Sequence, residues 1–133
     1  MSLLIDQLAA YLATQGEGTV GTTLFKLHRP SWPVASVSLH ATGGYPADGY
    51  TQRETPTVML FARAATPEGA LKKAYSLYGH LHGKQNLDLG GDLWALTVEA
   101  AASPAYVGTE QLGGATAHLA AFSIIVDLRT ASC

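Results

Sequence analysis

Cysteine is almost absent from this chain of 133 residues, and the one that occurs is Cys133 at the last position. A single thiol cannot form a disulfide within the chain, so the fold depends on its core. A chain of this length buries about 70% of its unfolded surface, which is enough to fold without a metal or a disulfide. The composition therefore predicts one soluble domain, residues 1–133, made in a reducing compartment.

Charged residues are also scarce, at 14% of the chain, where about a quarter is usual. A surface with few charges favours a protein that is partly covered by partners. The net charge is −2 and no basic tract occurs, so no sequence-specific nucleic-acid binding is expected. The first residues, MSLLIDQLAAYLATQG, lack the basic start of a signal peptide and the length of a membrane span, so no membrane association is expected.

The strongest local pattern is a strand, a turn and a helix between Glu54 and Gly83. The apolar run at 57–62 is typical of a central strand that is buried on both faces. Thr66, Pro67 and Glu68 have the chemistry of a helix start: a capping hydroxyl, a proline at the first position and an early negative charge. The helix then carries one apolar stripe, whose predicted members are Leu71, Ala74, Tyr75, Tyr78, Leu81 and His82.

The rest of the chain is expected to supply the sheet on which this unit packs. An amphipathic helix is predicted at 2–15, and alternating residues predict strands at 22–28, 34–41, 92–99 and 116–129. Within these strands, Ser36 and Ser38 are expected on a polar face and Trp94 on a buried one. Glycine and proline at 84–91 and 100–114 predict connections.

The resulting order, α-β-β-β-α-β-β, predicts an α+β fold. Two helices are expected on one face of a mainly antiparallel, mixed-order β-sheet, in a single two-layer domain. The longest stretch without an apolar period is Thr42 to Glu54, TGGYPADGYTQRE, which predicts a mobile loop or an extended hairpin tip. Loops of this length in small domains are usually functional or disordered. Its tyrosines, with Trp32, favour either an interface or local packing.

No arrangement of catalytic residues is visible in the sequence, so no catalytic residue and no cofactor is predicted. His80 and His82 point to different sides of a helix end and are poorly placed to share a metal, so no metal site is expected. Arg63, at the end of the central strand, is expected to be solvated or to pair with an acid from a loop or a neighbouring subunit. These features favour a non-enzymatic assembly module. The competing hypothesis is a small-ligand-binding or catalytic domain that uses Tyr75, Tyr78, His80 and His82.

The order of several short segments adds to this interpretation. After the leading helix come Thr42-Gly43-Gly44, then Thr55-Pro56-Thr57-Val58 running to Arg63, then a helix ending in Leu81-His82-Gly83. Residues 104–108, PAYVG, precede the long last strand. This arrangement resembles the minor capsid proteins of siphophages, which are similar to tail terminators. It departs from the family pattern at 109–112, where an acidic residue followed by arginine is expected.

The resemblance implies a structural virion protein of the phage head–tail neck. Such proteins form a homo-oligomeric ring, usually a hexamer, that caps the tail tube and ends its polymerisation. The implied partners are further copies of the chain, the tail tube protein and the head connector or stopper protein, assembled in the bacterial host cytoplasm. Another neck protein, for head completion or stopping, is the alternative. The expected assembly residues are Thr42, Gly43, Gly44, Tyr45, Tyr50, Gln52, Arg53 and Arg63.

Overall fold

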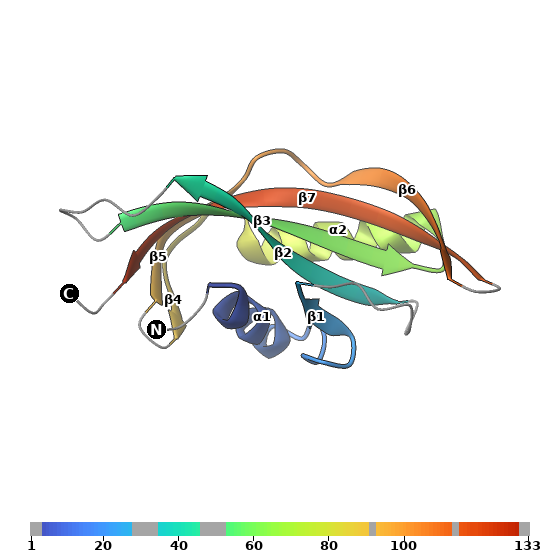
Figure 1. Cartoon of the computed structure of the whole chain (residues 1–133), viewed down its shortest axis with the longest axis horizontal. Helices are drawn as coiled ribbons and strands as arrows, with labels where there is room; N and C mark the ends of the chain where they lie inside the picture. The colour runs from blue at the N-terminus through green and yellow to red at the C-terminus, as the bar shows by residue number, and fades with distance from the viewer. Residues whose placement is uncertain (1–3, 28–34, 46–52, 91–92, 113–114, 131–133) are drawn as a thin grey trace.

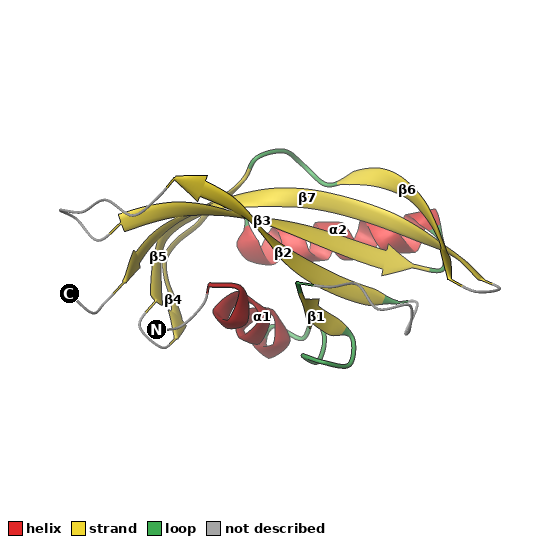
Figure 2. Ribbon diagram, viewed as in Figure 1, coloured by secondary structure: helices red, strands yellow, loops and turns green. Residues whose placement is uncertain are grey.

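The computed structural model describes residues 4–27, 35–45, 53–90, 93–112 and 115–130. Its helices are α1 (Leu4–Thr14) and α2 (Pro67–Leu81). Its strands are β1 (Leu24–Lys26), β2 (Ser36–Tyr45), β3 (Arg53–Ala64), β4 (Lys84–Gly90), β5 (Leu93–Ala100), β6 (Ala105–Leu112) and β7 (Ala115–Thr130). The strands form one curved sheet with both helices on its inner face (Figures 1 and 2). The predicted α+β class is confirmed.

The sheet is organised around its last strand. Its order is β1-β2-β3-β7-β5-β4, and only the short pair of β1 with β2 is parallel. One edge of β7 pairs with β3 along almost its whole length. The other edge pairs with β5 at 124–130 and with β6 at 115–121. The sixteen-residue β7 is therefore the common partner of three strands.

The strand–helix unit at the centre of the sequence forms as its residues predict. Thr66 caps α2 by accepting a hydrogen bond from the Gly69 amide at 3.0 Å, which satisfies one of the free amides of the first turn. Val58, Leu60 and Ala62 of β3 are buried beneath α2. No helix among the described residues has the length and apolarity needed to cross a membrane.

Two segments expected to be connections are strands, β4 and β6. Both predictions were based on a weak pattern, and the structure shows why the pattern is weak. Asn86 in β4 has a left-handed φ of 52°, and Gly108 in β6 has a φ of 151° next to a register shift against β7. Each irregularity breaks the two-residue alternation by which a strand is recognised in a sequence. These two strands are therefore recognised only by their hydrogen bonds to neighbouring strands.

The expected faces of two strands are also wrong in part. Ser36 and Ser38 are buried, because their cross-strand neighbours on β3 are the larger Arg63 and Phe61, which cover them. Trp94 is 39% exposed, whereas Ala95 and Val98 are buried. A register shift between Ala95 and Thr97 changes the phase of β5 at that point, so the residues on either side of it do not share the predicted face.

Candidate interaction surfaces

The predicted assembly loop is the end of a long hairpin. Thr42, Gly43, Gly44 and Tyr45 belong to β2, and Arg53 begins β3, so this part of the expected loop is strand. Tyr50 and Gln52 lie outside the described residues. Thr42 is the extra residue of a bulge, since Ala41 pairs with Val58 and Gly43 with Thr57.

The hairpin is tied together next to this bulge. The hydroxyls of Thr42 and Thr57 lie 2.6 Å apart and share a hydrogen bond. Arg53 pairs with Arg129, so the hairpin end lies beside the C-terminal end of β7. The strand pairing thus fixes the position of the hairpin end relative to the rest of the sheet.

Arg63 does not join the other predicted assembly residues. It pairs with Ser36, whereas Tyr45 pairs with Thr55, so about 26 Å of strand separates Arg63 from the hairpin end. Its side chain is 1% exposed and lies 2.7 Å from Glu110 of β6, whose side chain is 24% exposed. The arginine is therefore not solvated, and the acid that it contacts comes from the segment expected to be a loop.

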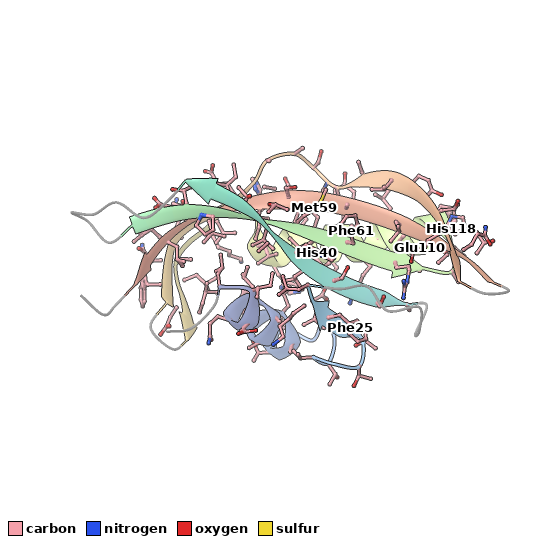
Figure 3. All side chains as sticks on the ribbon, viewed as in Figure 1. Phe25, His40, Met59, Phe61, Glu110 and His118 are labelled. Carbon is pink, nitrogen blue, oxygen red and sulfur yellow. The ribbon has the colours of Figure 1, made fainter. Side chains whose placement is uncertain are left out.

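This ion pair spans the central strand of the sheet. Arg63 is in register with Leu119 of β7, and Glu110, labelled in Figure 3, is in register with Ala117, so the side chains meet across β7. The small side chain of Ala117 leaves room for this approach. Nothing in the sequence links Arg63 to Glu110, because they are 47 positions apart and meet only through β7.

A polar seam joins α1 and the turn after it to α2. Glu17 is 8% exposed and accepts a hydrogen bond from the Ser76 hydroxyl at 3.0 Å. Its carboxylate lies 3.6 Å from the Lys73 ammonium and 3.7 Å from the His80 ring. Lys73 and Ser76 lie outside the apolar stripe predicted for this helix, and their use here was not predicted from the sequence. The spacing of Lys73, Ser76 and His80, three and four residues apart, was the available signal.

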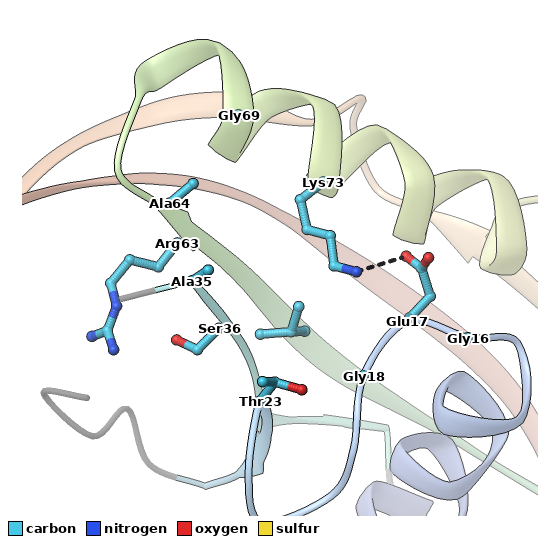
Figure 4. A pocket seen from close by; sticks show the side chains of 11 residues that line it. Gly16, Glu17, Gly18, Thr23, Ala35, Ser36, Arg63, Ala64, Gly69 and Lys73 are labelled. Carbon is cyan, nitrogen blue, oxygen red and sulfur yellow. Dashed lines mark ion pairs between the residues drawn. The ribbon is translucent and has the colours of Figure 1, made fainter. Parts of the chain in front are cut away.

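A cavity of about 400 Å³ opens beside this seam, between α2, β2 and β3. Its walls include several small residues, namely Gly16, Gly18, Ala35, Ser36, Ala64 and Gly69. The Lys73–Glu17 ion pair lies at one side, while the Arg63 side chain points away from both of them (Figure 4). The charged groups therefore do not converge on one point, and the described lining contains no arrangement of nucleophile and base.

Tyr11 of α1 also contacts α2 at this seam. The titration of its hydroxyl gives a testable prediction. Its hydroxyl donates to the His80 carbonyl at 3.1 Å, and burial raises the pKa of Tyr11 above its usual value of 10.0. The folded state thus keeps this proton longer than the unfolded state, so stability should fall as pH rises above about 10. Chemical denaturation of Tyr11→Phe between pH 9 and 11 should show a shallower fall than the parent. The same slope for Tyr11→Phe and the parent would show that the Tyr11 proton does not contribute to stability.

Helix α2 presents three arcs, because successive residues are about 100° apart. Ala70, Ala74, Leu77 and Leu81 are buried against the sheet, and Lys73, Ser76 and His80 face the seam. The third arc, Leu71, Tyr75, Tyr78 and His82, lies on the side away from α1, and we call it the aromatic flank. The predicted buried stripe is therefore right for Ala74 and Leu81, which are buried, and wrong for Tyr75, which is 47% exposed, and for His82, which is exposed.

The aromatic flank is ordered by contacts at its base. The His82 ring stacks on Tyr78 at 4.8 Å and accepts a hydrogen bond from the Ala100 amide. Tyr78 in turn meets Phe122 of β7 edge-on. His80 faces the seam, so the four residues of the competing ligand-site hypothesis do not share one arc. Within the described part of the chain, no group of three His, Cys, Asp or Glu residues could hold a metal.

The chain has measurable similarity to known proteins. A family model described as "Bacteriophage tail terminator protein" matches residues 11–127. No curated protein matches the chain. Among solved structures, it is similar to a chain of "Virion of native gene transfer agent (GTA) particle", with a TM-score of 0.48 and 15% identity over 91% of this chain and 83% of that chain.

Proposed function

Because this chain belongs to the bacteriophage tail terminator family and has a structural role in the tail or neck of a virion, we propose that it caps the tail tube. In this proposal, several copies form a closed ring, a hexamer by analogy with the family. The ring sits on the last layer of tube subunits, ends polymerisation and joins the tail to the head connector or stopper protein. Residues 1–133 act as one tail-terminator domain, assembled in the bacterial cytoplasm.

The family match carries this proposal, since it covers strands β1 to β6, most of β7, the whole of α2 and the end of α1. A ring of identical copies needs a heterologous interface, in which two different surfaces of each copy meet. A cap that stops growth needs one ring face that matches the tube and another that does not. Both requirements concern the shape and chemistry of surfaces, so the proposed activity is assembly and involves no catalysis.

The hairpin end is the proposed contact with the tube. Thr42, Gly43, Gly44, Tyr45 and Arg53 are held there by the pairing of β2, β3 and β7, and Tyr50 and Gln52 lie in the intervening segment. Arg63 enters the proposal as a residue that holds β6 against the sheet.

The proposal predicts a change of mass that depends on the tube. Multi-angle light scattering of the pure protein should show a ring, or a monomer that becomes a ring when tail tube protein is added. The reason is that each copy in a closed ring is held by two contacts at once, so contacts that are weak one by one give a stable assembly. Tube polymerisation followed by electron microscopy should stop at a defined length after the protein is added. A strict monomer that leaves tube growth unchanged would contradict the proposal, and binding only to a connector would favour the stopper alternative.

A further inference from the structure

The aromatic flank of α2 is covered by the sheet only in part, since Leu71 and Tyr78 are half-buried against the core and Tyr75 is exposed. It carries a shallow hollow of about 410 Å³ lined by Glu68, Leu71, Lys72 and Tyr75. Tyr75 stands beside this hollow, with its ring edge-on to Tyr78 at 6.0 Å. Because the contacts at the base fix Tyr78 and His82, the flank is preorganised before any partner arrives. Preformed aromatic surfaces with little conformational freedom to lose are favoured at protein interfaces.

A second unusual feature is Leu27, at the end of β1. Its backbone is left-handed, with a φ of 67°, and its side chain is 59% exposed. A hydrogen bond from its amide to the Leu39 carbonyl at 2.7 Å holds this conformation. A branched side chain is disfavoured in the left-handed region, and glycine or asparagine would fit there without the exposed apolar surface. Such local strain at an exposed residue points to a functional role for the side chain.

Leu27 and the aromatic flank lie on opposite sides of the molecule. Strand β1 forms one edge of the sheet and contacts α1. The aromatic flank is the arc of α2 that faces away from α1, towards the side of β5 and β6. In Figure 1, α2 accordingly appears behind β3 and β7, whereas α1 and β1 lie below these strands. Two different surfaces on opposite sides are what a heterologous ring contact requires.

Charged side chains stand beside both surfaces. Lys26, next to Leu27, forms an ion pair with Asp6 of α1 at 2.7 Å. The hollow beside Tyr75 is bordered by one acid, Glu68, and one base, Lys72. Each surface thus carries one charge of each sign, so two copies would be complementary in the orientation that brings Lys26 to Glu68 and Asp6 to Lys72. Such matching fixes the register of an interface more than it raises affinity.

We propose that the occupant of the aromatic flank is a second copy of this chain, whose Leu27 enters the hollow beside Tyr75. This inference rests on the proposed ring, and it assigns the two surfaces from which the ring is made. Repeated around the ring, each copy gives its Leu27 to one neighbour and receives the Leu27 of the other.

Single substitutions separate assembly from folding. Leu27→Gly removes the side chain and relieves the left-handed backbone, so its melting temperature should equal the parent's or exceed it by up to about 4 °C. Assembly should nevertheless weaken at least about tenfold, as expected for loss of a central apolar anchor. Tyr75→Ser should weaken assembly in the same way. Ile125→Thr, at a residue that is 39% exposed on the other face of the sheet, is the matched control and should assemble normally.

Mixing the two variants tests the direction of the contact. Leu27→Gly retains an intact aromatic flank, and Tyr75→Ser retains an intact Leu27, so each mixed pair can make one contact and no more. The mixture should therefore give dimers by sedimentation velocity, while each variant alone stays monomeric. Rings in the mixture, or dimers of one variant alone, would overturn the head-to-tail assignment.

Cross-linking tests the contact even where free copies associate weakly. In a Cys133→Ser background, the double variant Leu27→Cys/Tyr75→Cys should give a ladder of disulfide-linked multimers on oxidation, on tubes or at high concentration. The double variant Leu27→Cys/Ile125→Cys should give none. If the parent forms rings, Leu27→Cys/Tyr75→Cys gives no ladder and Leu27→Gly still assembles, then the assigned interface is wrong and the proposed ring is retained. If the parent neither self-associates nor caps tubes, the proposed function itself fails.

Discussion

Replacing residues 46–52 with Asn-Gly is expected to abolish tube capping and leave the fold intact. The change keeps Tyr45 and Arg53, so the pairs of Tyr45 with Thr55 and of Arg53 with Arg129 can still form. It leaves four residues between Tyr45 and Thr55, a common length for a hairpin connection. The protein concentration needed to cap tubes should rise at least about a hundredfold, because the proposed tube contact loses its central segment.

Two measurements on the same variant separate folding from capping. The denaturation midpoint should stay within the range of neutral surface changes, about 0.5 kcal/mol. The length distribution of polymerised tubes should match that of tubes grown without any cap. A variant with the same seven residues in scrambled order is the control for composition. Normal capping by the Asn-Gly variant would remove the hairpin end from the mechanism, and capping by the scrambled variant would reduce its role to that of a spacer.

Glu110→Ala is expected to lower the free energy of unfolding by about 3 kcal/mol. This should be the largest loss caused by any single substitution of a side chain that water reaches. Arg63 is 2% exposed, so the substitution removes a carboxylate from a guanidinium that has little access to water. A buried charge that loses a partner is far more costly than a solvated one, where the loss is usually under about 1 kcal/mol. The melting temperature should fall by about 10 °C for a domain of this size.

Controls for this prediction come from the same sheet. Glu99→Ala, at an exposed glutamate of β5, should change stability by less than about 0.5 kcal/mol. The double variant Arg63→Leu/Glu110→Leu should recover most of the loss, because removing both charges avoids the desolvation penalty. If urea denaturation gives Glu110→Ala the same midpoint as Glu99→Ala, the pair across β7 has no structural role.

The sequence predicts local structure well wherever neighbours in the chain decide it. Thr66 and Pro67 start α2 at the predicted residues. The strand predicted at 116–129 is present, and its alternation appears in the buried residues Ala120, Phe122, Ile124, Val126 and Leu128 of β7. Both depend on capping or alternation within a few positions. The α+β class follows from the same local patterns.

The misses share a cause, which is dependence on distant residues. Strands β4 and β6 are polar and interrupted by Asn86 and Gly108, so pairing with β5 and β7 defines them. Periodicity shows that α2 is apolar over a wide arc, but it does not decide whether Leu77 or Tyr75 meets the sheet. Small residues such as Ala70 and Ala74 allow a close approach, and they select the arc that packs.

The composition of residues 42–54 predicted a mobile loop or an extended hairpin tip. Strand pairing extends β2 as far as Tyr45, and the use of this end as an interface stays a prediction. The role of Leu27 has no signature in the sequence, because a left-handed leucine in the stretch LFKL looks like an ordinary strand residue. Only backbone geometry distinguishes it.

The position of β7 has a consequence for the order in which the molecule folds. This strand comes after all the others in the chain, yet β3, β5 and β6 all pair with it. During synthesis, β1 to β3 can form one paired unit and β4 with β5 another, and the sheet closes only when β7 leaves the ribosome. Contacts between residues so far apart in sequence slow folding, and incomplete chains cannot present a finished surface. Completion of the sheet would thereby restrict the proposed ring assembly to copies that contain β7.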